Sequence, residues 1–162
     1  MTTSSGAANA MQAEIDEFTA ILTQQGVPAA LRYLNSRTPH RYTGIFRFDG
    51  DTLRNEALFD QFDPGVTRGQ DTPIHETYCS LVGGQAAPLE ILDATTDGRV
   101  IGVVETPVVS YCGVLIRDAA GKAFGTLCHY DMHRCQVRST DLPLLNAAGA
   151  LLYQQLPPAA TA

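Results

Sequence analysis

The sequence predicts an α+β fold in which an antiparallel sheet is covered by helices from both ends of the chain. The stretch 110–131, SYCGVLIRDAAGKAFGTLCHYD, has two runs of β-branched, aromatic and small apolar residues around a Gly-containing turn. This pattern is typical of a β-hairpin, which we expect at the centre of the sheet. Near both ends of the chain, apolar residues recur instead at helical spacing.

Composition and charge are those of one ordinary globular domain. A chain of 162 residues can bury a sufficient core without disulfides or metals. Its net charge is -6 and it has no cluster of Lys and Arg, so we expect no nucleic-acid partner. Because there is no signal-peptide pattern and no apolar run approaching the roughly 20 residues of a membrane span, we predict a cytoplasmic protein with no membrane partner. In that compartment the four cysteines are expected as thiols.

The first third of the chain predicts two helices and a hairpin. Residues 1–9 are Thr, Ser, Gly and Ala in the main, and we expect a flexible leader there. A helix is predicted over 10–25, where apolar residues share one face, and a second, shorter helix begins at about Pro28 and ends by Ser36. Alternation predicts strands over 42–49 and 52–59, joined at the turn Asp49-Gly50-Asp51.

The segment between the two hairpins is predicted to be less regular. Pro and Gly without periodicity indicate a loop over 61–71, and we expect Thr72-Pro73 to open a helix that runs through Leu81 and stops at Gly83-Gly84. A short strand is predicted over 88–93. An irregular link over 94–106 leads to the central hairpin.

After the hairpin, residues 139–141 offer side chains that can cap a helix predicted over about 141–155. Leucines lie on more than one side of this helix. One side can cover the sheet, and the surplus predicts a homodimer through the terminal helices. The domain is therefore expected over 10–156, followed by a disordered tail at 157–162.

Alternation along the hairpin sorts its side chains into two unlike faces. Cys112, Val114 and Ile116 form one apolar row, which we expect to pack on the helices. On the second strand, one row contains Phe124, Thr126, Cys128 and Tyr130, and the other contains Gly125, Leu127 and His129. A row that mixes rings, a hydroxyl and a thiol is unusual for a plain core, since buried polar groups need partners. It predicts the wall of a small-molecule pocket.

Several motifs in order, HETYCSLV, PLEILDA and the hairpin itself, make the chain resemble a GAF domain of bacterial signalling proteins. The residues that stand at the family's positions are Tyr78-Cys79, Asp93, Tyr111, Gly113, Arg117, Gly121, Gly125-Thr126-Leu127-Cys128 and Asp131. The resemblance implies a sheet of about six strands with the first and last helices on one face and a ligand pocket on the other. It also implies a sensory role in signal transduction, with a kinase or another regulator as partner.

We predict the pocket between the sheet and residues 65–98, with ligand binding ordering the loop 61–71. The sequence does not specify a cofactor, a catalytic residue or a metal ligand. The predicted ligand-binding residues are Phe46, His75, Tyr78, Cys79, Asp93, Tyr111, Thr126, Cys128 and Tyr130.

Four alternatives stay open. His75 is a candidate axial ligand for haem and Cys79 a candidate attachment site for a bilin. The run from Cys128 to Cys135, with its histidines and Asp131, has side chains that zinc prefers, although alternation directs Cys128 away from His129. The fold that the chain resembles is also used by free methionine sulfoxide reductases, which employ paired cysteines, and Cys79, Cys112 and Cys128 are the candidates here. Alternation separates Cys112 from Cys128.

Overall fold

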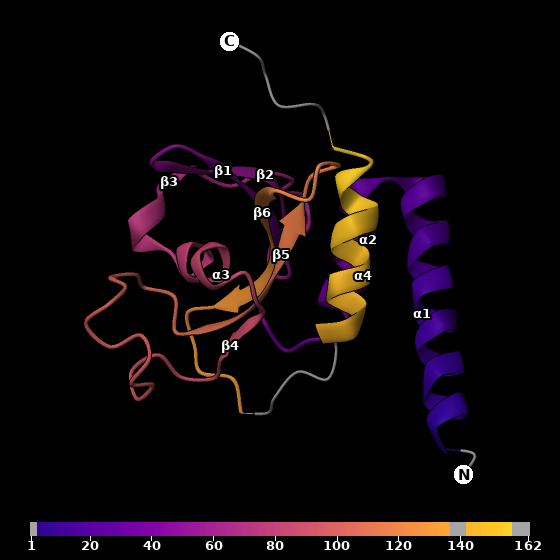
Figure 1. Cartoon of the computed structure of the whole chain (residues 1–162), viewed down its shortest axis with the longest axis horizontal. Helices are drawn as coiled ribbons and strands as arrows, with labels where there is room; N and C mark the ends of the chain where they lie inside the picture. The colour runs from indigo at the N-terminus through magenta and orange to yellow at the C-terminus, as the bar shows by residue number, and fades with distance from the viewer. Residues whose placement is uncertain (1–2, 137–141, 157–162) are drawn as a thin grey trace.

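The computed structural model describes residues 3–136 and 142–156 (Figure 1). None of the helices in this part of the chain is both long and apolar enough to cross a bilayer. In chain order the elements are α1 (Thr3–Gln25), α2 (Val27–Asn35), β1 (Tyr42–Asp49), β2 (Thr52–Asp60), β3 (Thr72–Pro73), the 3-10 helix η1 (Ile74–Glu76), α3 (Cys79–Gln85), β4 (Leu89–Ile91), β5 (Ser110–Arg117), β6 (Ala123–Asp131) and α4 (Leu142–Tyr153).

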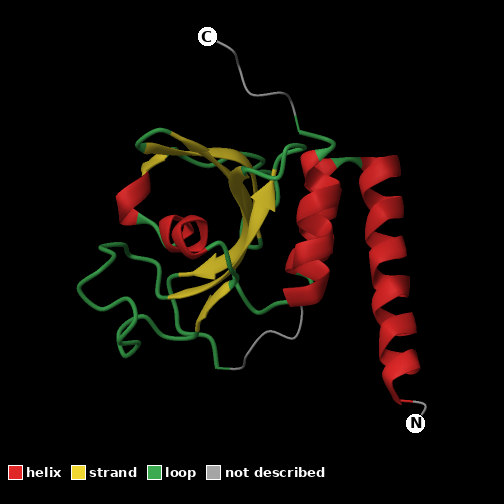
Figure 2. Cartoon of the chain, in the orientation of Figure 1, coloured by secondary structure: helices red, strands yellow, loops and turns green. Residues whose placement is uncertain are grey.

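The strands form one six-stranded sheet in the order β3-β2-β1-β6-β5-β4, and every neighbouring pair is antiparallel. The predicted hairpin of β5 and β6 therefore lies inside the sheet, with β1 along the other edge of β6. Helices α1, α2 and α4 lie on one side of the sheet, and α3 lies on the other with the long connections (Figure 2). The α+β class and the six strands are confirmed.

The main hydrophobic core fills the space between the sheet and the three helices. Cys112, Val114 and Ile116 face it, as alternation predicts, together with Leu127 from β6. Phe18 of α1 meets them from the helical side and is fully buried. Burying one such large apolar side chain contributes about 1.5–3 kcal/mol, so this layer fixes the register of the central strands.

Helix α1 is longer than predicted. It begins at Thr3 and not at Ala10, so most of the segment expected as a flexible leader is its first turns. The physical reason is that Ala8 and Ala10 favour helix and the segment contains no proline. In Figure 1 these first turns extend past the end of α4. The predicted cap at 139–141 and the predicted tail at 157–162 lie outside the described residues.

The helix predicted over 72–81 is wrong in its first half. Thr72 and Pro73 pair with β2 instead, and Pro73 is extended with φ -56° and ψ 130°. One 3-10 turn follows, and extended Thr77 separates that turn from α3. Proline can begin a helix, but here the β2 edge offers its neighbours a strand partner, and tertiary pairing decides the structure.

Helix α3 also runs through Gly83-Gly84, where we expected it to stop, and ends at left-handed Ala86. A Cβ atom on Gly83 would lie 2.9 Å from Cζ of Phe48. The glycine therefore allows α3 to approach the ring of Phe48 in β1, and it is a packing residue rather than a stop signal.

The register of β5 and β6 shifts at a β-bulge. Ile116 pairs with Gly125 and Arg117 with Ala123, which leaves Phe124 without an opposite residue. The ring of Phe124 lies 5.1 Å from that of Tyr153 in α4, edge to face, on the helical side of the sheet. The prediction that Phe124 shares a face with Thr126 is therefore wrong, because an extra residue reverses the alternation.

Candidate functional site

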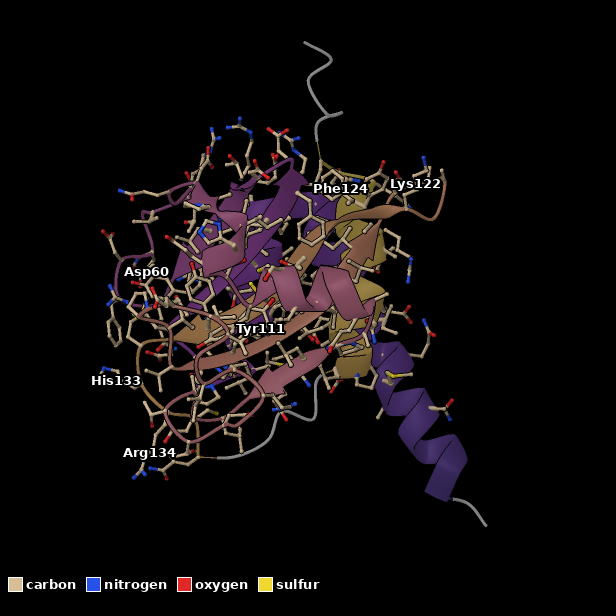
Figure 3. The ribbon with its side chains drawn as sticks, turned by 60° about the vertical axis from the view of Figure 1, so that its left-hand side comes forward. Asp60, Tyr111, Lys122, Phe124, His133 and Arg134 are labelled. Atoms are coloured by element: carbon tan, nitrogen blue, oxygen red, sulfur yellow. The ribbon has the colours of Figure 1, made fainter. Side chains whose placement is uncertain are left out.

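A cavity of about 430 Å³ lies on the face of the sheet opposite the three large helices. Its floor comes from β1, β2, β5 and β6, and its walls from the start of α3 and two connections. Figure 3 views this side, with Tyr111 close to α3 and Phe124 toward α4. The lining residues are Tyr42, Phe46, Leu53, Asn55, Leu58, Gly69, Gln70, Thr72, Glu76, Thr77, Tyr78, Cys79, Thr106, Pro107, Val108, Tyr111, Cys128, Tyr130 and Met132.

Most of the predicted ligand-binding residues meet at this cavity. The six that line it are Phe46, Tyr78, Cys79, Tyr111, Cys128 and Tyr130. Thr126 is fully buried beside them, where its hydroxyl donates a hydrogen bond to Cys79. That these seven residues contact a ligand stays a prediction.

His75 and Asp93 lie outside the cavity. The His75 side chain is 77% exposed, because a 3-10 turn replaces the predicted α-helix at this position. Asp93 accepts hydrogen bonds from the backbone and hydroxyl of Thr95 at 3.0 and 2.6 Å, and so closes a turn after β4. The lining also comes from 69–79 and 106–108 rather than from all of 65–98.

Buried polar side chains converge around the sulfur of Cys79, at the start of α3. Thr126 Oγ1 donates to Cys79 Sγ at 3.1 Å, and Tyr111 Oη lies 3.3 Å from the same sulfur. Cys128 is a further side chain that lowers the pKa of Cys79. Thr126 and Cys128 are two residues apart on β6 and therefore point to one face. The polar side chains of this cluster therefore find hydrogen-bond partners within it, and the cluster borders the cavity.

Gly113 makes room for this cluster. It lies opposite Cys128 in the pairing of β5 with β6. A Cβ atom on Gly113 would stand 2.3 Å from Tyr111 Oη, so the missing side chain is the space that the phenol occupies. The glycine of the Tyr-Cys-Gly sequence thus positions Tyr111 over the two thiols.

The two cysteines of the cluster differ in acidity. Burial raises the pKa of Cys79, but hydrogen bonds from Cys128, Thr126 and Tyr111 outweigh burial, and the pKa of Cys79 lies below its ordinary value. Burial, followed by the hydrogen bond to Cys79, holds the pKa of Cys128 well above its ordinary value. The thiol of Cys79 is therefore the more acidic of the two.

Aromatic rings make up much of the remaining wall. Tyr42 and Tyr130 stack with ring centroids 4.9 Å apart, and the ring of Phe46 lies 6.1 Å from that of Tyr130. On the opposite wall Tyr78 and Tyr111 are 5.4 Å apart. Burial, with the charges of nearby Cys128 and Cys79 next in size, raises the pKa of Tyr130 above its usual range, so its phenol stays neutral.

One residue of β2, Asn55, holds the loop that borders the cavity. Its side-chain oxygen accepts a hydrogen bond from the backbone N–H of Gly69 at 2.7 Å, and its backbone N–H donates to the carboxylate of Asp71 at 2.9 Å. Arg68 donates to the Asn55 carbonyl at 3.1 Å. These bonds fix the end of the predicted loop 61–71 against the sheet.

Sequence reasoning missed Asn55, Tyr42 and the segment 106–108. Tyr42 was detectable, because alternation from Phe46 along β1 places it on the same face. Asn55 was not, since a register shift in the pairing of β1 with β2 decides its neighbours. Tyr78 Oη donates to the carbonyl of Val108 at 2.8 Å, and no local pattern predicts that contact between segments 30 residues apart.

A second polar group lies on the helical face and is separate from the cavity. His40 and His129 stack with ring centroids 5.9 Å apart. Their Nδ1 atoms lie 2.5 Å from Thr38 Oγ1 and 2.6 Å from Thr43 Oγ1, respectively. Their Nε2 atoms are buried and have no hydrogen-bond partner among the residues that the structure describes. Burial, reinforced by neighbouring His40, lowers the pKa of His129 to about 3.

The candidate zinc ligands after Cys128 do not converge. Cys128 faces the cavity and His129 the helical core, while His133 is exposed at the edge of the face that Figure 3 shows. Across 3–136 and 142–156, no three or more His, Cys, Asp or Glu side chains stand close enough to hold a metal ion.

Comparison with solved structures defines the class of this protein: the chain has the GAF fold. No family model matches the sequence, and no curated protein matches it either. The GAF domain of a phosphoenolpyruvate-protein phosphotransferase from Acinetobacter aligns with a TM-score of 0.69 at 13% identity, over 90% of this chain and 91% of that one.

Two other solved structures of this fold are a reductase and a chromophore-binding domain. Free methionine-R-sulfoxide reductase from Neisseria meningitidis, in complex with its substrate, aligns with a TM-score of 0.64 at 15% identity over 87% of this chain and 84% of that one. The phycoerythrobilin-bound GAF domain of a cyanobacterial phytochrome aligns with a TM-score of 0.64 at 12% identity over 91% and 97%. At these identities the likeness establishes the fold alone.

Proposed function

We propose that this chain is a sensory domain that binds a small molecule in the cavity beneath α3 and acts in cytoplasmic signal transduction. The observation that carries the proposal is a hollow of about 430 Å³, of the size of many ligand sites, lined by aromatic rings and a buried cluster of thiols and hydroxyls. GAF-fold neighbours support it, because one of them holds a bilin. Its output would pass to a kinase or another regulator.

The charges of the lining favour an uncharged or cationic ligand. Among the described lining residues there is no Lys, Arg or His, and Glu76 at the rim is the one charged side chain. Burying an anion without a paired cation is costly, and a nearby carboxylate increases that cost. A nitrate ion or a cyclic nucleotide therefore does not fit this lining.

Thermal unfolding of the whole chain tests this proposal with small metabolites matched in size and differing in charge. Uncharged or cationic compounds are expected to raise the melting temperature. At ten times its Kd, a ligand adds about 1.4 kcal/mol, or roughly 3–6 °C for a domain of this size. Nitrate and cyclic nucleotides are expected to leave the melting temperature unchanged.

Two variants make the test specific to the cavity. Cys128→Phe places a ring in the cavity and is expected to abolish the shift, whereas His75→Ala, on the exposed 3-10 turn, is expected to keep it. Stabilisation by anions alone, or a shift that survives Cys128→Phe, would refute binding at this site.

A second candidate function is reduction of free methionine sulfoxide. Two buried thiols, Cys79 and Cys128, line the same cavity and favour it, and one neighbour of this fold has that activity. Cys112 cannot join them, because it is buried on the helical face. Turnover of free methionine sulfoxide with a dithiol reductant, lost in Cys79→Ser, would identify the enzyme and replace the sensor proposal.

We also propose that the chain forms a homodimer through α1 and α4. The first turns of α1 project past the end of α4 (Figure 1), and Met11, further along α1, is 38% exposed. Met11→Lys is expected to raise the dimer dissociation constant about tenfold or more, since it buries a charge in the interface. Native mass spectrometry measures this, with Ile101→Lys, at a more exposed apolar residue outside α1 and α4, as the matched control. A monomeric wild-type chain at micromolar concentration would exclude the interface.

A further inference from the structure

Aromatic rings line the cavity on opposite walls. The five lining residues that carry a ring come from β1, β5, β6 and the position before α3: Tyr42, Phe46, Tyr78, Tyr111 and Tyr130. The rings of Tyr78 and Tyr111 are inclined to each other by 59°, and those of Phe46 and Tyr130 by 56°. Because the rings are inclined at different angles, the cavity meets ring faces as well as edges. The face of an aromatic ring carries the negative part of its quadrupole.

We propose that the ligand of this cavity is a small quaternary ammonium ion, held against the faces of these rings. The inference rests on the proposed function, since it names a class of ligand for the same site. A cation over a ring face is attracted by the quadrupole, and the attraction is strongest where both are removed from water. The exposed fractions of Phe46, Tyr78 and Tyr111 are 8%, 4% and 3%, so water competes little for these rings.

The charges of the lining favour a cation over a neutral molecule of the same shape. Among the described lining residues none is basic, and Glu76 is the one that carries a charge. Its side chain is 47% exposed, so the carboxylate stands at the rim, where it attracts a cation through water that screens it only in part. A neutral ligand gains nothing from this carboxylate and lacks the charge that the ring faces attract.

The hydrogen-bond acceptors of the lining distinguish a quaternary from a primary ammonium. Oδ1 of Asn55 already accepts the backbone N–H of Gly69 at 2.7 Å, and Oγ1 of Thr106 accepts that of Val108 at 3.3 Å. A primary ammonium brings three N–H donors, and each needs an acceptor once it leaves water. A quaternary ammonium brings none, and its methyl groups suit apolar lining residues such as Leu53.

The chain already holds a cation against one ring of this wall. The guanidinium of Arg41 lies 4.8 Å from the ring centroid of Tyr42 and 4.6 Å from that of Phe62. Arg41 is outside the lining, and Asp60 balances its charge through hydrogen bonds of 2.8 and 3.0 Å. Tyr42 in turn stacks on Tyr130, with ring centroids 4.9 Å apart. The ring pair is therefore compatible with a cation, and its cavity side offers the same kind of surface to a ligand.

Calorimetry of the full chain with three matched compounds tests the proposal. Choline carries a trimethylammonium group, its neutral isostere carries a tert-butyl group instead, and ethanolamine carries a primary ammonium. At pH 8, where ordinary histidines are neutral, choline is expected to bind at least about tenfold more tightly than either of the others. Equal affinity for choline and its isostere, or tighter binding of ethanolamine, would overturn this proposal and leave the sensory function standing. If no compound of any charge class bound, the sensory function would fail as well.

Variants of one ring connect the preference to the aromatic wall. Tyr130→Leu removes a ring but keeps an apolar side chain, and it is expected to lower the ratio of choline affinity to isostere affinity about threefold or more. Tyr130→Phe restores the ring and should keep the wild-type ratio. Tyr33→Leu is the matched control, because its ring packs near Phe18 on the helical side, 6.3 Å away, and the ratio should not change.

A rim variant keeps the test decisive even where Tyr130→Leu does not fold. Glu76→Gln changes a side chain that is 47% exposed, so the fold should tolerate it. At low salt it is expected to weaken choline binding about threefold and to leave the affinity of the neutral isostere unchanged. A preference for choline that survives both Tyr130→Leu and Glu76→Gln would place its binding elsewhere and overturn the proposal.

Discussion

Gly125→Ala is expected to destabilise the fold by at least about 3 kcal/mol. The added methyl group would clash with backbone atoms of the neighbouring strand, and these atoms cannot shift unless the whole strand moves. Gly125 lies in β6 between Arg47 of β1 and Ile116 of β5. A Cβ atom there would lie 1.8 Å from the carbonyl oxygen of Phe46 and 2.9 Å from Cα of Arg47. The strands β1 and β6 would have to separate, and that would open the centre of the sheet.

Chemical denaturation monitored by circular dichroism measures the loss in the free energy of unfolding. In a thermal scan, a loss of about 3 kcal/mol corresponds to a fall in melting temperature of roughly 6–12 °C. Gly98→Ala is the matched control, since a Cβ atom on Gly98 has no atom within 4 Å and its stability should change by less than about 0.5 kcal/mol. If the two variants were equally stable, the close approach of β1 to Gly125 would be wrong.

The second large effect is expected from acid. Burial, with the charge of neighbouring His40 as a smaller cause, lowers the pKa of His129 to about 3, and burial likewise lowers the pKa of His40. Between the ordinary histidine pKa of about 6.5 and that lower value, the unfolded chain binds protons that the folded chain does not. Stability is therefore fully present above about pH 6.5 and is lost as the pH falls toward 3. From pH 7 to pH 5, His129 alone is expected to account for about 2 kcal/mol.

Urea titrations at pH 7 and pH 5 test this expectation, and His129→Asn should flatten the difference between them. Asparagine offers an acceptor near the position of Nδ1 and keeps a partner for Thr43, but it does not titrate. We expect the variant to be less stable than the wild type at both pH values, so the informative quantity is the change in stability with pH. His75→Asn, on the exposed 3-10 turn, controls for the loss of an imidazole elsewhere. An unchanged slope in His129→Asn would show that other groups cause the acid sensitivity.

Local patterns predicted the sheet because its strands have two unlike faces. Cys112, Val114 and Ile116 pack on the helices, while Tyr111 lies on the cavity side, as alternation requires. The same rule separated Cys128 from His129. Each of these predictions depends only on residues that lie close together in the sequence.

The failures lie where distant segments decide the outcome. Phe124 changed face because a bulge inserted one residue, and a period-two pattern does not survive an insertion. Pro73 pairs with β2 and does not begin a helix, because the edge of the sheet provides a strand partner that is distant in the sequence. Asn55 and Val108 reach the cavity through contacts across 14 and 30 residues. The site residues on each strand were therefore predicted, but the contacts that the connecting segments make at the site were not.

The position of His129 between Cys128 and Tyr130 joins the two faces of the sheet through a single stretch of backbone. The imidazole lies in the helical core, and its two chain neighbours form part of the cavity wall. We expect a ligand that displaces Cys128 or Tyr130 to shift the backbone of His129 as well, and so to link ligand binding to the protonation of its imidazole. A titration followed by calorimetry in buffers of different ionisation enthalpy would measure the proton uptake that accompanies binding.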